Sequence, residues 1–506
     1  MLCRPRPAPA HRKIALLLLI AWLPGLSFGG ITPKLLVSRA SGPAPLAVHF
    51  DASQTAVDDA AVNPTGDLGY KFDFGDPDSG TWTHSGKPKN QQIGGPIAAH
   101  VYDQPGTYTV SLEVHSPAGG QVNTSVTITV QSPDTAYPGS STVCLVMDAA
   151  KTVLCPPSSI VRVAPTSWGS FANDTRYMLA SGDNFTSLGT ATVNCQNCMI
   201  MKMGEGPNPK LGKVSYGSKP VFPQRGNFVL SGVSAESLSI GFGEALLVAQ
   251  SEFNYPPTAP SASAVVLAGD TVAYYYNNPG SIDPAKIMRP RNLVFSENKI
   301  DGGGVSSKGV YLIANNLVFM GNEVKNTLGH NVRVPFTRNG FIAHNLLIAG
   351  TNETKHNLKI HSSGYEETAA DYYGDSKTPS TDMVVVSSNR IGGPDGDVNN
   401  WQIAASPQSD LFSEGLSRLI FEDNRFVWNP TAPSGQQQLA VTGRYVIERG
   451  NAFTNKTDQV GVGENTHGKL VPVEWKGPYL TGLSSVSDWI NSSKESPPAP
   501  VQLQVQ

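Results

Sequence analysis

Charge is scarce in this sequence. Asp, Glu, Lys and Arg make up 15% of the 506 residues, and the formal net charge is -3. Without a basic excess the chain lacks the electrostatic attraction on which nucleic acids and anionic membrane surfaces depend, so we expect neither as its main partner. Beyond residue 29 the chain also has no apolar run long enough to cross a bilayer, which predicts no membrane span after removal of the N-terminal segment.

Cysteine is rare as well, with five residues in the whole chain. The first lies in residues 1–29, where basic residues precede an apolar run and small residues follow it, as in a secretory signal peptide. A membrane anchor is the alternative, but the apolar run is short for spanning a bilayer. We therefore predict a secreted protein that resides outside the cell, at the cell surface or in a periplasm.

Four cysteines remain after signal removal: Cys144, Cys155, Cys195 and Cys198. An even number of cysteines in an exported protein favours disulfide bonds, and Cys144 and Cys155 bracket a loop of hairpin size. Cys195 and Cys198 have the spacing of a metal or redox pair, but no second pair or nearby histidine completes a zinc site. We expect structural disulfides.

Glycine and proline, by contrast, are abundant, at 50 and 39 residues. With so few charges, this composition is typical of short strands joined by turns and not of a helical protein. The length allows two or three domains. The expected fold class is therefore all-β.

Residues 31–131 carry the pattern of a self-contained β-sandwich. The motif DFGDPDSG begins at Asp73, and HVYDQPGTYTVSLEV, which begins at His100, runs from a Pro-Gly turn into a strand of strict period two. Both motifs closely resemble those of PKD domains, which are immunoglobulin-like sandwiches found beside many secreted enzymes. The resemblance implies a spacer or a glycan-binding module and supplies no catalytic residue.

Residues 132–163, which include Cys144 and Cys155, are expected to form a linker and a cap. Residues 164–475 then repeat one phrase, an apolar run that ends in asparagine. These asparagines are Asn298, Asn322, Asn345, Asn389, Asn424 and Asn451, spaced by 24, 23, 44, 35 and 27 residues. Coils of about 24 residues with insertions predict a parallel β-helix with a hydrogen-bonded asparagine stack along its axis. Residues 476–506 have the composition of an irregular tail.

A second repeat is interleaved with the first. Residues 330–334, HNVRV, return 26 residues later as residues 356–360, HNLKI. In a solenoid each strand lies above its counterpart one coil earlier, which places Arg333 next to Lys359. The pattern resembles the right-handed parallel β-helix superfamily of pectate lyases and other polysaccharide-active enzymes, a fold that also serves hydrolases, epimerases and adhesins.

Alignment of this phrase across the coils predicts an outward row on one face. Period two assigns to the interior Val332, Val334, Leu358, Ile360, Trp401 and Ile403. The outward row is then Tyr311, Arg333, Lys359, Gln402 and Ala440, flanked by Asn331, Asn357 and Asn400. We expect Asn331, Asn357 and Gln402 to line a substrate groove.

Arg333 and Lys359 are the main functional signal. Adjacent strands lie about 4.8 Å apart, so the two like charges destabilise each other unless an anion binds at the pair. The alternative is that both are solvated surface side chains that point apart. His361 on the same face, and the long insertion of roughly residues 363–381 after it, favour a binding site.

β-Elimination on a uronic-acid polysaccharide suits this cluster. The reaction needs a cation for the C6 carboxylate, a base for the C5 proton and an acid for the leaving oxygen. Arg333 can clamp the carboxylate, and Lys359 can act as the base because a neighbouring positive charge lowers the pKa of an ammonium group. His361 and Tyr311 are the candidate acids.

One family of β-helix lyases pairs a lysine base with an arginine on the next coil, and residues 333–345 are similar to its arginine-bearing strand and turn. Here Tyr311 stands where that family has lysine, and Lys359 comes one coil later, so the acid and base assignments stay open. His330 and His356, at the strand starts, are candidates for substrate binding or for a stacked structural role. No acidic cluster flanks the row, so neither calcium nor another cofactor is expected.

Three other functions stay open beside an acidic-polysaccharide lyase. A glycoside hydrolase needs two carboxyl groups. Its candidates are Glu366, Glu367, Asp371 and Asp375 of the insertion and Asp301 or Glu323 of the coils, while Tyr372 is a candidate for stacking on a sugar ring. A uronan C5-epimerase would use nearly the same proton-abstraction site as the lyase, and a glycan-binding adhesin would need no catalytic group.

Overall fold

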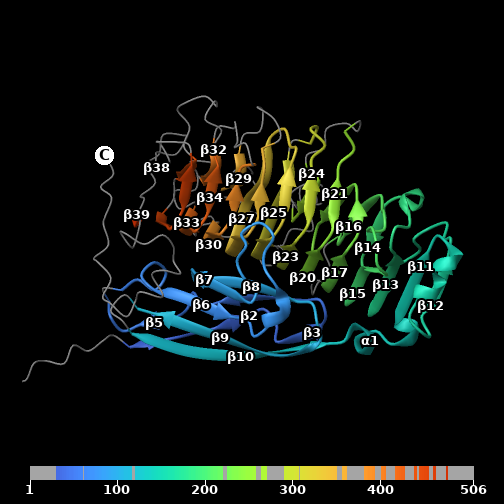
Figure 1. The fold of residues 1–506 in the computed structure, drawn as a ribbon, viewed down its shortest axis with the longest axis horizontal. Coiled ribbons are helices and arrows are strands. Elements are labelled where there is room, and N and C mark those ends of the chain that lie inside the picture. Colours follow the sequence, from blue (N-terminus) through green and yellow to red (C-terminus); the bar gives the residue numbers. More distant parts are fainter. Residues whose placement is uncertain are drawn as a thin grey trace, which may run out of the picture.

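The structure is a computed structural model that describes residues 30–60, 62–116, 120–219, 225–257, 264–269, 290–306, 308–349, 356–361, 381–393, 401–405, 416–427, 438–441, 444–454, 460–462 and 475–476. These residues form an immunoglobulin-like sandwich and a parallel β-helix, which confirms the expected fold class. The coils of the β-helix stand in a row along the molecule, and the sandwich lies along one side of them (Figure 1). Within these ranges no helix has the length and apolar character to cross a membrane.

The sandwich consists of two antiparallel sheets and a short extra pair. The larger sheet has the strand order β3 (Ser41–Pro43), β10 (Gln121–Gln131), β9 (Gly106–His115), β6 (Gly69–Asp73) and β7 (Gln91–Gly94), in which β3 and β10 are parallel. The smaller sheet has the order β2 (Leu36–Val37), β4 (Leu46–Asp51) and β8 (Ile97–Tyr102), and β1 (Ile31–Thr32) pairs with β5 (Ala56–Val57). Phe50, Phe72 and Phe74 are fully or almost fully buried between the sheets, because period two points them inward.

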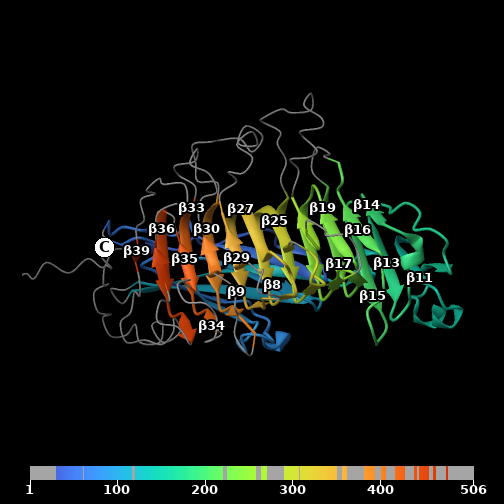
Figure 2. The same ribbon diagram turned by 90° about the horizontal axis from the view of Figure 1, so that it is seen from above.

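The β-helix has three faces, each built of parallel strands from successive coils. The first face consists of β11 (Thr142–Val146), β13 (Thr175–Ala180), β15 (Cys198–Met203), β17 (Gly226–Ser231), β20 (Glu244–Ala249), β23 (Arg291–Ser296), the second halves of β25 (Lys308–Met320) and β27 (His330–Ala343), β30 (Thr381–Ser387), β33 (Leu416–Glu422), β36 (Arg444–Arg449) and β39 (Trp475–Lys476). The second face consists of β14 (Ala191–Val193), β16 (Lys213–Tyr216), β19 (Ser237–Ile240), β22 (Val266–Ala268), the first halves of β25 and β27, β29 (His356–Ile360), β32 (Trp401–Ala405), β35 (Leu439–Val441) and β38 (Val460–Val462). The short strand β12 (Ile160–Val163) pairs with β11 at the N-terminal end of the first face. The third face consists of β18 (Ser234–Ala235), β21 (Glu252–Asn254), β24 (Lys299–Asp301), β26 (Glu323–Lys325), β28 (Leu346–Leu347), β31 (Arg390–Ile391), β34 (Arg425–Val427) and β37 (Ala452–Thr454). Figure 2 shows the regular succession of these strands from above.

The connection between the domains is short. The helix α1 (Pro133–Ala136) follows β10 directly, and the side chain of Ser132 caps its first turn. Parallel pairing starts at β11, which pairs with β12 and β13. The first strands of the β-helix therefore lie within residues 132–163, where the sequence suggested a linker and cap.

The asparagine stack forms as the sequence predicts. The Nδ2 atom of Asn322 lies 3.1 Å from Oδ1 of Asn345, and the Nδ2 atom of Asn345 lies 2.8 Å from Oδ1 of Asn389. The same bond joins the neighbouring members at 2.9 Å: Asn298 to Asn322, Asn389 to Asn424, and Asn424 to Asn451. The stack links six coils because each buried amide donates to one coil and accepts from the next.

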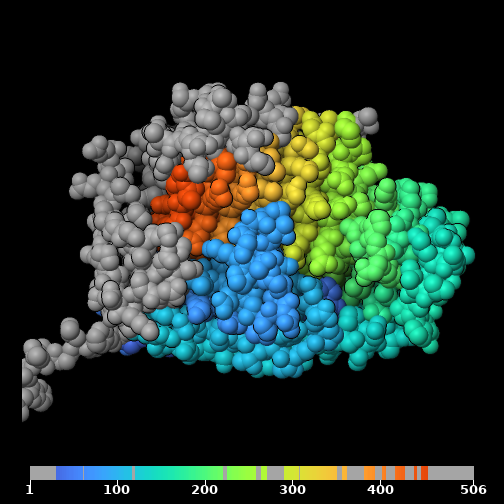
Figure 3. Space-filling view, viewed as in Figure 1, coloured from blue at the N-terminus to red at the C-terminus, as the bar shows by residue number. Residues whose placement is uncertain are grey.

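The sandwich packs on the first face of the β-helix. One outward position of this face is apolar in nine consecutive coils and lies in register throughout: Met199, Val229, Leu247, Val294, Val318, Phe341, Val385, Ile420 and Ile447. Ala47, Ile97 and Ala99 of the sandwich cover this column. Strands such as β23, with the run Leu293-Val294-Phe295, are thus apolar on both faces because both faces are buried. In Figure 3 part of the sandwich lies directly over the coils of this face.

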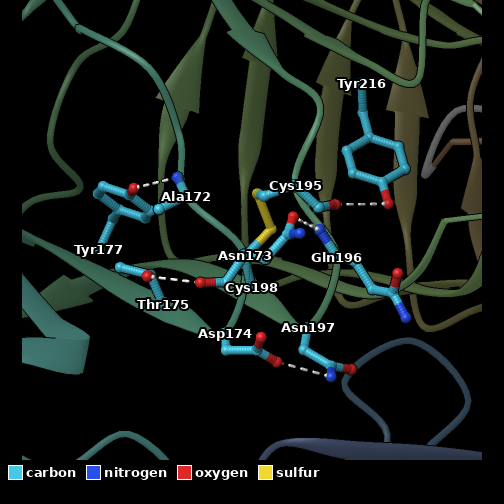
Figure 4. Close-up of a disulfide and its surroundings, with 10 residues drawn as sticks. All are labelled: Ala172, Asn173, Asp174, Thr175, Tyr177, Cys195, Gln196, Asn197, Cys198 and Tyr216. Atoms are coloured by element: carbon cyan, nitrogen blue, oxygen red, sulfur yellow. Dashed lines mark hydrogen bonds between the residues drawn. A yellow bond between two sulfur atoms is a disulfide. The ribbon is translucent and has the colours of Figure 1, made fainter.

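Both expected disulfide pairs are present and lie near the N-terminal end of the β-helix. Cys144 bonds to Cys155, and Cys195 bonds to Cys198. Around the second bond, Tyr216 donates a hydrogen bond to the carbonyl of Cys195, and the amide of Gln196 donates to the side chain of Asn173 (Figure 4). Both disulfides are structural in position, since Cys144, Cys195 and Cys198 are fully buried.

Candidate functional site

Arg333 and Lys359 lie side by side on the second face of the β-helix. In the parallel pairing of β27 with β29, Arg333 is the register partner of Lys359, and in the pairing of β25 with β27 it is the register partner of Tyr311. Ala404 and Ala440 continue the row on the next coils. The two cationic side chains that the repeat predicts as neighbours are therefore neighbours in the fold.

Burial and charge both act on Lys359. Burial of the amine is the larger cause and the positive charge of Arg333 the smaller, and together they lower the pKa of Lys359 from 10.5 to about 8. A low-dielectric environment disfavours the ammonium form, and a nearby guanidinium does the same. Near neutral pH Lys359 therefore has an accessible neutral form, which is what a lysine base requires.

His361 holds Arg333 in place. The Nε of Arg333 donates a hydrogen bond of 2.8 Å to Nε2 of His361. The imidazole is 2% exposed, and its pKa is lowered well below 6.5, first by burial and then by the charge of Arg333. Because Nε2 accepts, the neutral ring carries its proton on Nδ1, which has no hydrogen-bond partner among the described residues.

The backbone around His361 is also anchored. Its amide donates to the carbonyl of Val334, and Thr381 donates from its hydroxyl to the carbonyl of His361 at 2.7 Å. A neutral, accepting imidazole suits a residue that orients a guanidinium better than it suits a proton donor. Of the two candidate acids, the geometry therefore favours Tyr311.

Tyr311 contacts two cations. The guanidinium carbon of Arg333 lies 5.6 Å from the centroid of the phenol ring, and Nζ of Lys308 lies 5.1 Å from it. Cations over a phenol ring are attracted by its quadrupole. Tyr311 and Arg333 thus hold each other on adjacent coils.

His330 and His356 form a stacked pair at the starts of β27 and β29. They are register partners, their ring centroids lie 4.9 Å apart, and their Nδ1 atoms lie 3.1 Å apart. The register partner of His330 on β25 is Lys308. Sequence alignment missed Lys308, although extending the repeated phrase one residue upstream of Gly309 would have found it.

Asn331, Asn357 and Gln402 do not line a groove, contrary to the sequence expectation. All three are 0% exposed. The side-chain amide of Asn331 donates a hydrogen bond of 2.8 Å to the carbonyl of Ile348 and one of 2.6 Å to Oδ1 of Asn357. Their position at a corner of the coil explains the burial, since the chain turns there and leaves carbonyl groups that buried amides satisfy.

Gln402 is also shifted by two residues from its expected place. Lys359 pairs with Ala404, and the registers His356 with Trp401 and Leu358 with Ile403 put Gln402 beside Asn357. The side chain of Gln402 donates a hydrogen bond of 2.7 Å to the carbonyl of Val427 and accepts one of 3.0 Å from the side chain of Gln438. The long insertion before this coil hides the register, so the sequence alignment placed Gln402 beside Lys359.

Of the residues proposed for a hydrolase, the structure describes Asp301 and Glu323, which do not lie on this face. Asp301 and Glu323 lie on the third face, where the Asp301 carboxylate accepts from the side chain of Asn326 and Glu323 pairs with Lys325 at 3.0 Å. Glu323 lines a pocket of about 550 Å³ between the sandwich and the third face, with Thr83, His84, Glu252, Glu297 and Lys299. Tyr372, Asn400 and the carboxylates of the insertion, like the signal segment and the tail, lie outside the described residues.

No group of three or more His, Cys, Asp or Glu side chains that could hold a metal ion occurs in the described ranges. The candidate site is the basic pair of Arg333 and Lys359 on the second face, with Tyr311 and His361 beside it, and this pair can meet an anionic ligand.

Comparison with known families identifies the sandwich. Residues 36–130 match the PKD domain. This confirms the resemblance of the N-terminal motifs, and with the two disulfides it is compatible with an extracellular protein. No curated protein matches the chain.

Proposed function

We propose that this protein is a secreted polysaccharide lyase that cleaves a uronic-acid-containing polysaccharide by β-elimination, on a β-helix of the pectate-lyase-like kind. The observation that supports the proposal most directly is the pairing of Lys359, with a pKa of about 8, and Arg333 on adjacent coils. A base whose neutral form is accessible near neutral pH and a permanent cation beside it are the two groups that proton abstraction next to a carboxylate requires.

The proposed reaction assigns one task to each residue. Arg333, oriented by His361, binds the C6 carboxylate and stabilises the negative charge that develops on it. The neutral amine of Lys359 takes the proton from C5. The electron pair of the broken C5–H bond forms a double bond between C4 and C5 as the C4–O bond breaks, and the Tyr311 hydroxyl protonates the leaving oxygen.

The test is incubation of the purified protein with a panel of uronic-acid polysaccharides while ultraviolet absorbance is followed. Elimination creates a conjugated double bond that absorbs ultraviolet light, whereas hydrolysis creates reducing ends without such a double bond. We expect the wild-type protein to produce this signal and Lys359→Ala to lose it, with Lys299→Ala, an exposed lysine of the third face, as the matched control.

Other outcomes would reassign the function. Reducing ends without the double bond would move the chemistry to a carboxylate pair and overturn the lyase. Exchange of the C5 proton with solvent, without cleavage, would make the protein a uronan C5-epimerase, since that reaction uses the same base. Binding without any reaction would make it a glycan-binding adhesin.

A further inference from the structure

The N-terminal end of the β-helix carries an uncovered apolar surface. Among the residues that the structure describes, six large hydrophobic side chains are exposed, and five of them lie close together in the sequence: Val153, Leu154, Ile160, Val161 and Val163. The side chain of Val153 is 85% exposed. Single exposed hydrophobic side chains are normal on a protein surface, but their concentration in one place is typical of a contact surface.

Most of these side chains share one side of the sheet. Val161 is the register partner of Cys144 on β11, and Val163, two residues further on, faces the same way. Cys155, which is bonded to Cys144, directly follows the 3-10 helix η3 (Ala149–Leu154). The disulfide therefore brings the end of η3 to the side of β11 on which Cys144 lies. We name these side chains the end patch: Val153, Leu154, Val161 and Val163.

The strand β12 beside the end patch is also an open edge. In the pairings of the described residues, β12 pairs with β11 alone. Alternate N–H and C=O groups along its outer edge therefore point away from the sheet. Its one charged side chain, Arg162, lies on the opposite side from Val161 and donates to the carbonyl of Trp168. An open edge next to an apolar patch is the geometry to which a further strand adds.

The sequence contains a segment that fits this edge. Residues 501–506, VQLQVQ, alternate strictly between apolar residues and glutamine and carry no charge. This period of two is the pattern of a strand with one apolar side, and valine favours strands. A strand that adds to an edge binds through its backbone, and its alternate side chains fill the neighbouring apolar surface. Residues 501–506 lie outside the described ranges.

The distance along the β-helix indicates which molecule supplies the segment. Strands β12 and β39 lie at opposite ends of the row of coils (Figure 1). From β12 through β11 to β39 the pairings span twelve strand spacings, or roughly 58 Å. Residues 477–500 separate β39 from the segment, and a flexible chain of that length has a root-mean-square span of about 27 Å. The β12 edge of a neighbouring molecule is therefore easier to reach than the edge of the same molecule.

We propose that residues 501–506 of one molecule add as a strand to the outer edge of β12 in a second copy, with Val501, Leu503 and Val505 against the end patch. This inference does not depend on the proposed function. Two different surfaces meet in this contact, so it joins molecules head to tail, in open rows or closed rings. A strand of six residues buries less than the roughly 1,200 Å² of the smallest stable interfaces, so the association is weak and depends on concentration.

Sedimentation velocity of the purified protein tests the contact. The weight-average mass of the wild-type protein should rise with concentration between about 5 and 200 µM. Leu503→Pro removes a backbone donor in the middle of the segment, and Val161→Lys places a charge on the end patch. Each variant should keep the mass of a monomer. Leu36→Lys is the matched control, because Leu36 is similarly exposed but lies in the sandwich, and this variant should associate like the wild type.

A mixture of the two variants tests the head-to-tail geometry. Leu503→Pro keeps an intact β12 edge and Val161→Lys keeps an intact segment, so a 1:1 mixture should form a dimer and nothing larger. A wild-type protein that stays monomeric at every concentration would overturn the proposal. Association of Leu503→Pro alone would show that β12 edges pair with each other, and association of Val161→Lys alone would show that the segment binds elsewhere. Either result would also overturn it.

Discussion

Trp82 of the sandwich stacks on His344 of the β-helix, with ring centroids 4.9 Å apart and ring planes 8° from parallel. Ser85 contacts Nδ1 of His344 at 2.9 Å, and Gln92 contacts Nε2 at 3.0 Å. One β-helix side chain is thus held on both ring nitrogens and on one ring face by the sandwich. The PKD domain is fixed on the coils in this structure, in contrast to a loosely tethered spacer.

Replacing Trp82 tests how much this contact stabilises the protein. The indole is 5% exposed and also covers Gly321, where an added Cβ would lie 2.6 Å from the ring. Trp82→Ala should lower the free energy of unfolding by about 3 kcal/mol, and Trp82→Phe, which keeps a stacking ring, by less. Denaturant titration measures both, and equal stability of the two variants would contradict the stacking role.

His344 makes domain docking sensitive to acid. Burial, and then the charge of Lys87, lower the pKa of His344 well below 6.5. The unfolded chain takes up this proton near pH 6.5 and the folded protein does not, so stability is full above that pH and falls below it. Unfolding titrations from about pH 7.5 down to pH 5.5 should show this loss. The His344→Gln variant should lose less stability over the same pH range. An equally steep loss of stability in this variant would point to other buried histidines.

Lys359 predicts the pH dependence of the proposed reaction. Its pKa of about 8 means that the fraction of neutral amine rises through that pH. Measured at substrate concentrations well below KM, kcat/KM should therefore rise tenfold per pH unit well below pH 8 and level off above pH 8. A profile that is flat between about pH 6 and 9 would remove Lys359 from the role of base.

Lys359 should also lower the free energy of unfolding of the protein. A lowered pKa means that the folded state disfavours the charged amine, and this penalty is complete below pH 8 and vanishes above pH 10.5. Lys359→Met should raise the free energy of unfolding at neutral pH by up to about 3 kcal/mol while abolishing elimination. Thermal unfolding checks this. A variant less stable than the wild type would show that Lys359 makes net favourable contacts.

His361 is expected to act through Arg333. His361→Ala removes the acceptor of the Arg333 Nε proton, so kcat/KM should fall at least about tenfold because the carboxylate clamp is no longer oriented. His361→Gln, which keeps an acceptor, should restore part of the activity. The pH profile set by Lys359 should keep its shape in both variants, whereas loss of a second ionisation would identify His361 as a proton donor.

The repeats of the sequence determine much of this fold. The asparagine stack and the pairing of Arg333 with Lys359 follow from the spacing of the repeated phrases, because a parallel coil puts equivalent residues directly above each other. The PKD motifs determine the sandwich in the same way, through turns and period-two strands. These features are local or periodic, so they can be recognised in one amino-acid sequence.

Only the tertiary structure decides the rest. Gln402 lies two residues away from its expected place in the row because the insertion before it hides the register, and Asn331 turns inward because the coil bends there. The bond from Arg333 to His361 and the docking of Trp82 on His344 join residues without any shared periodicity. Such contacts depend on where side chains meet in space, and that position is set by packing between coils and domains and not by spacing along the chain.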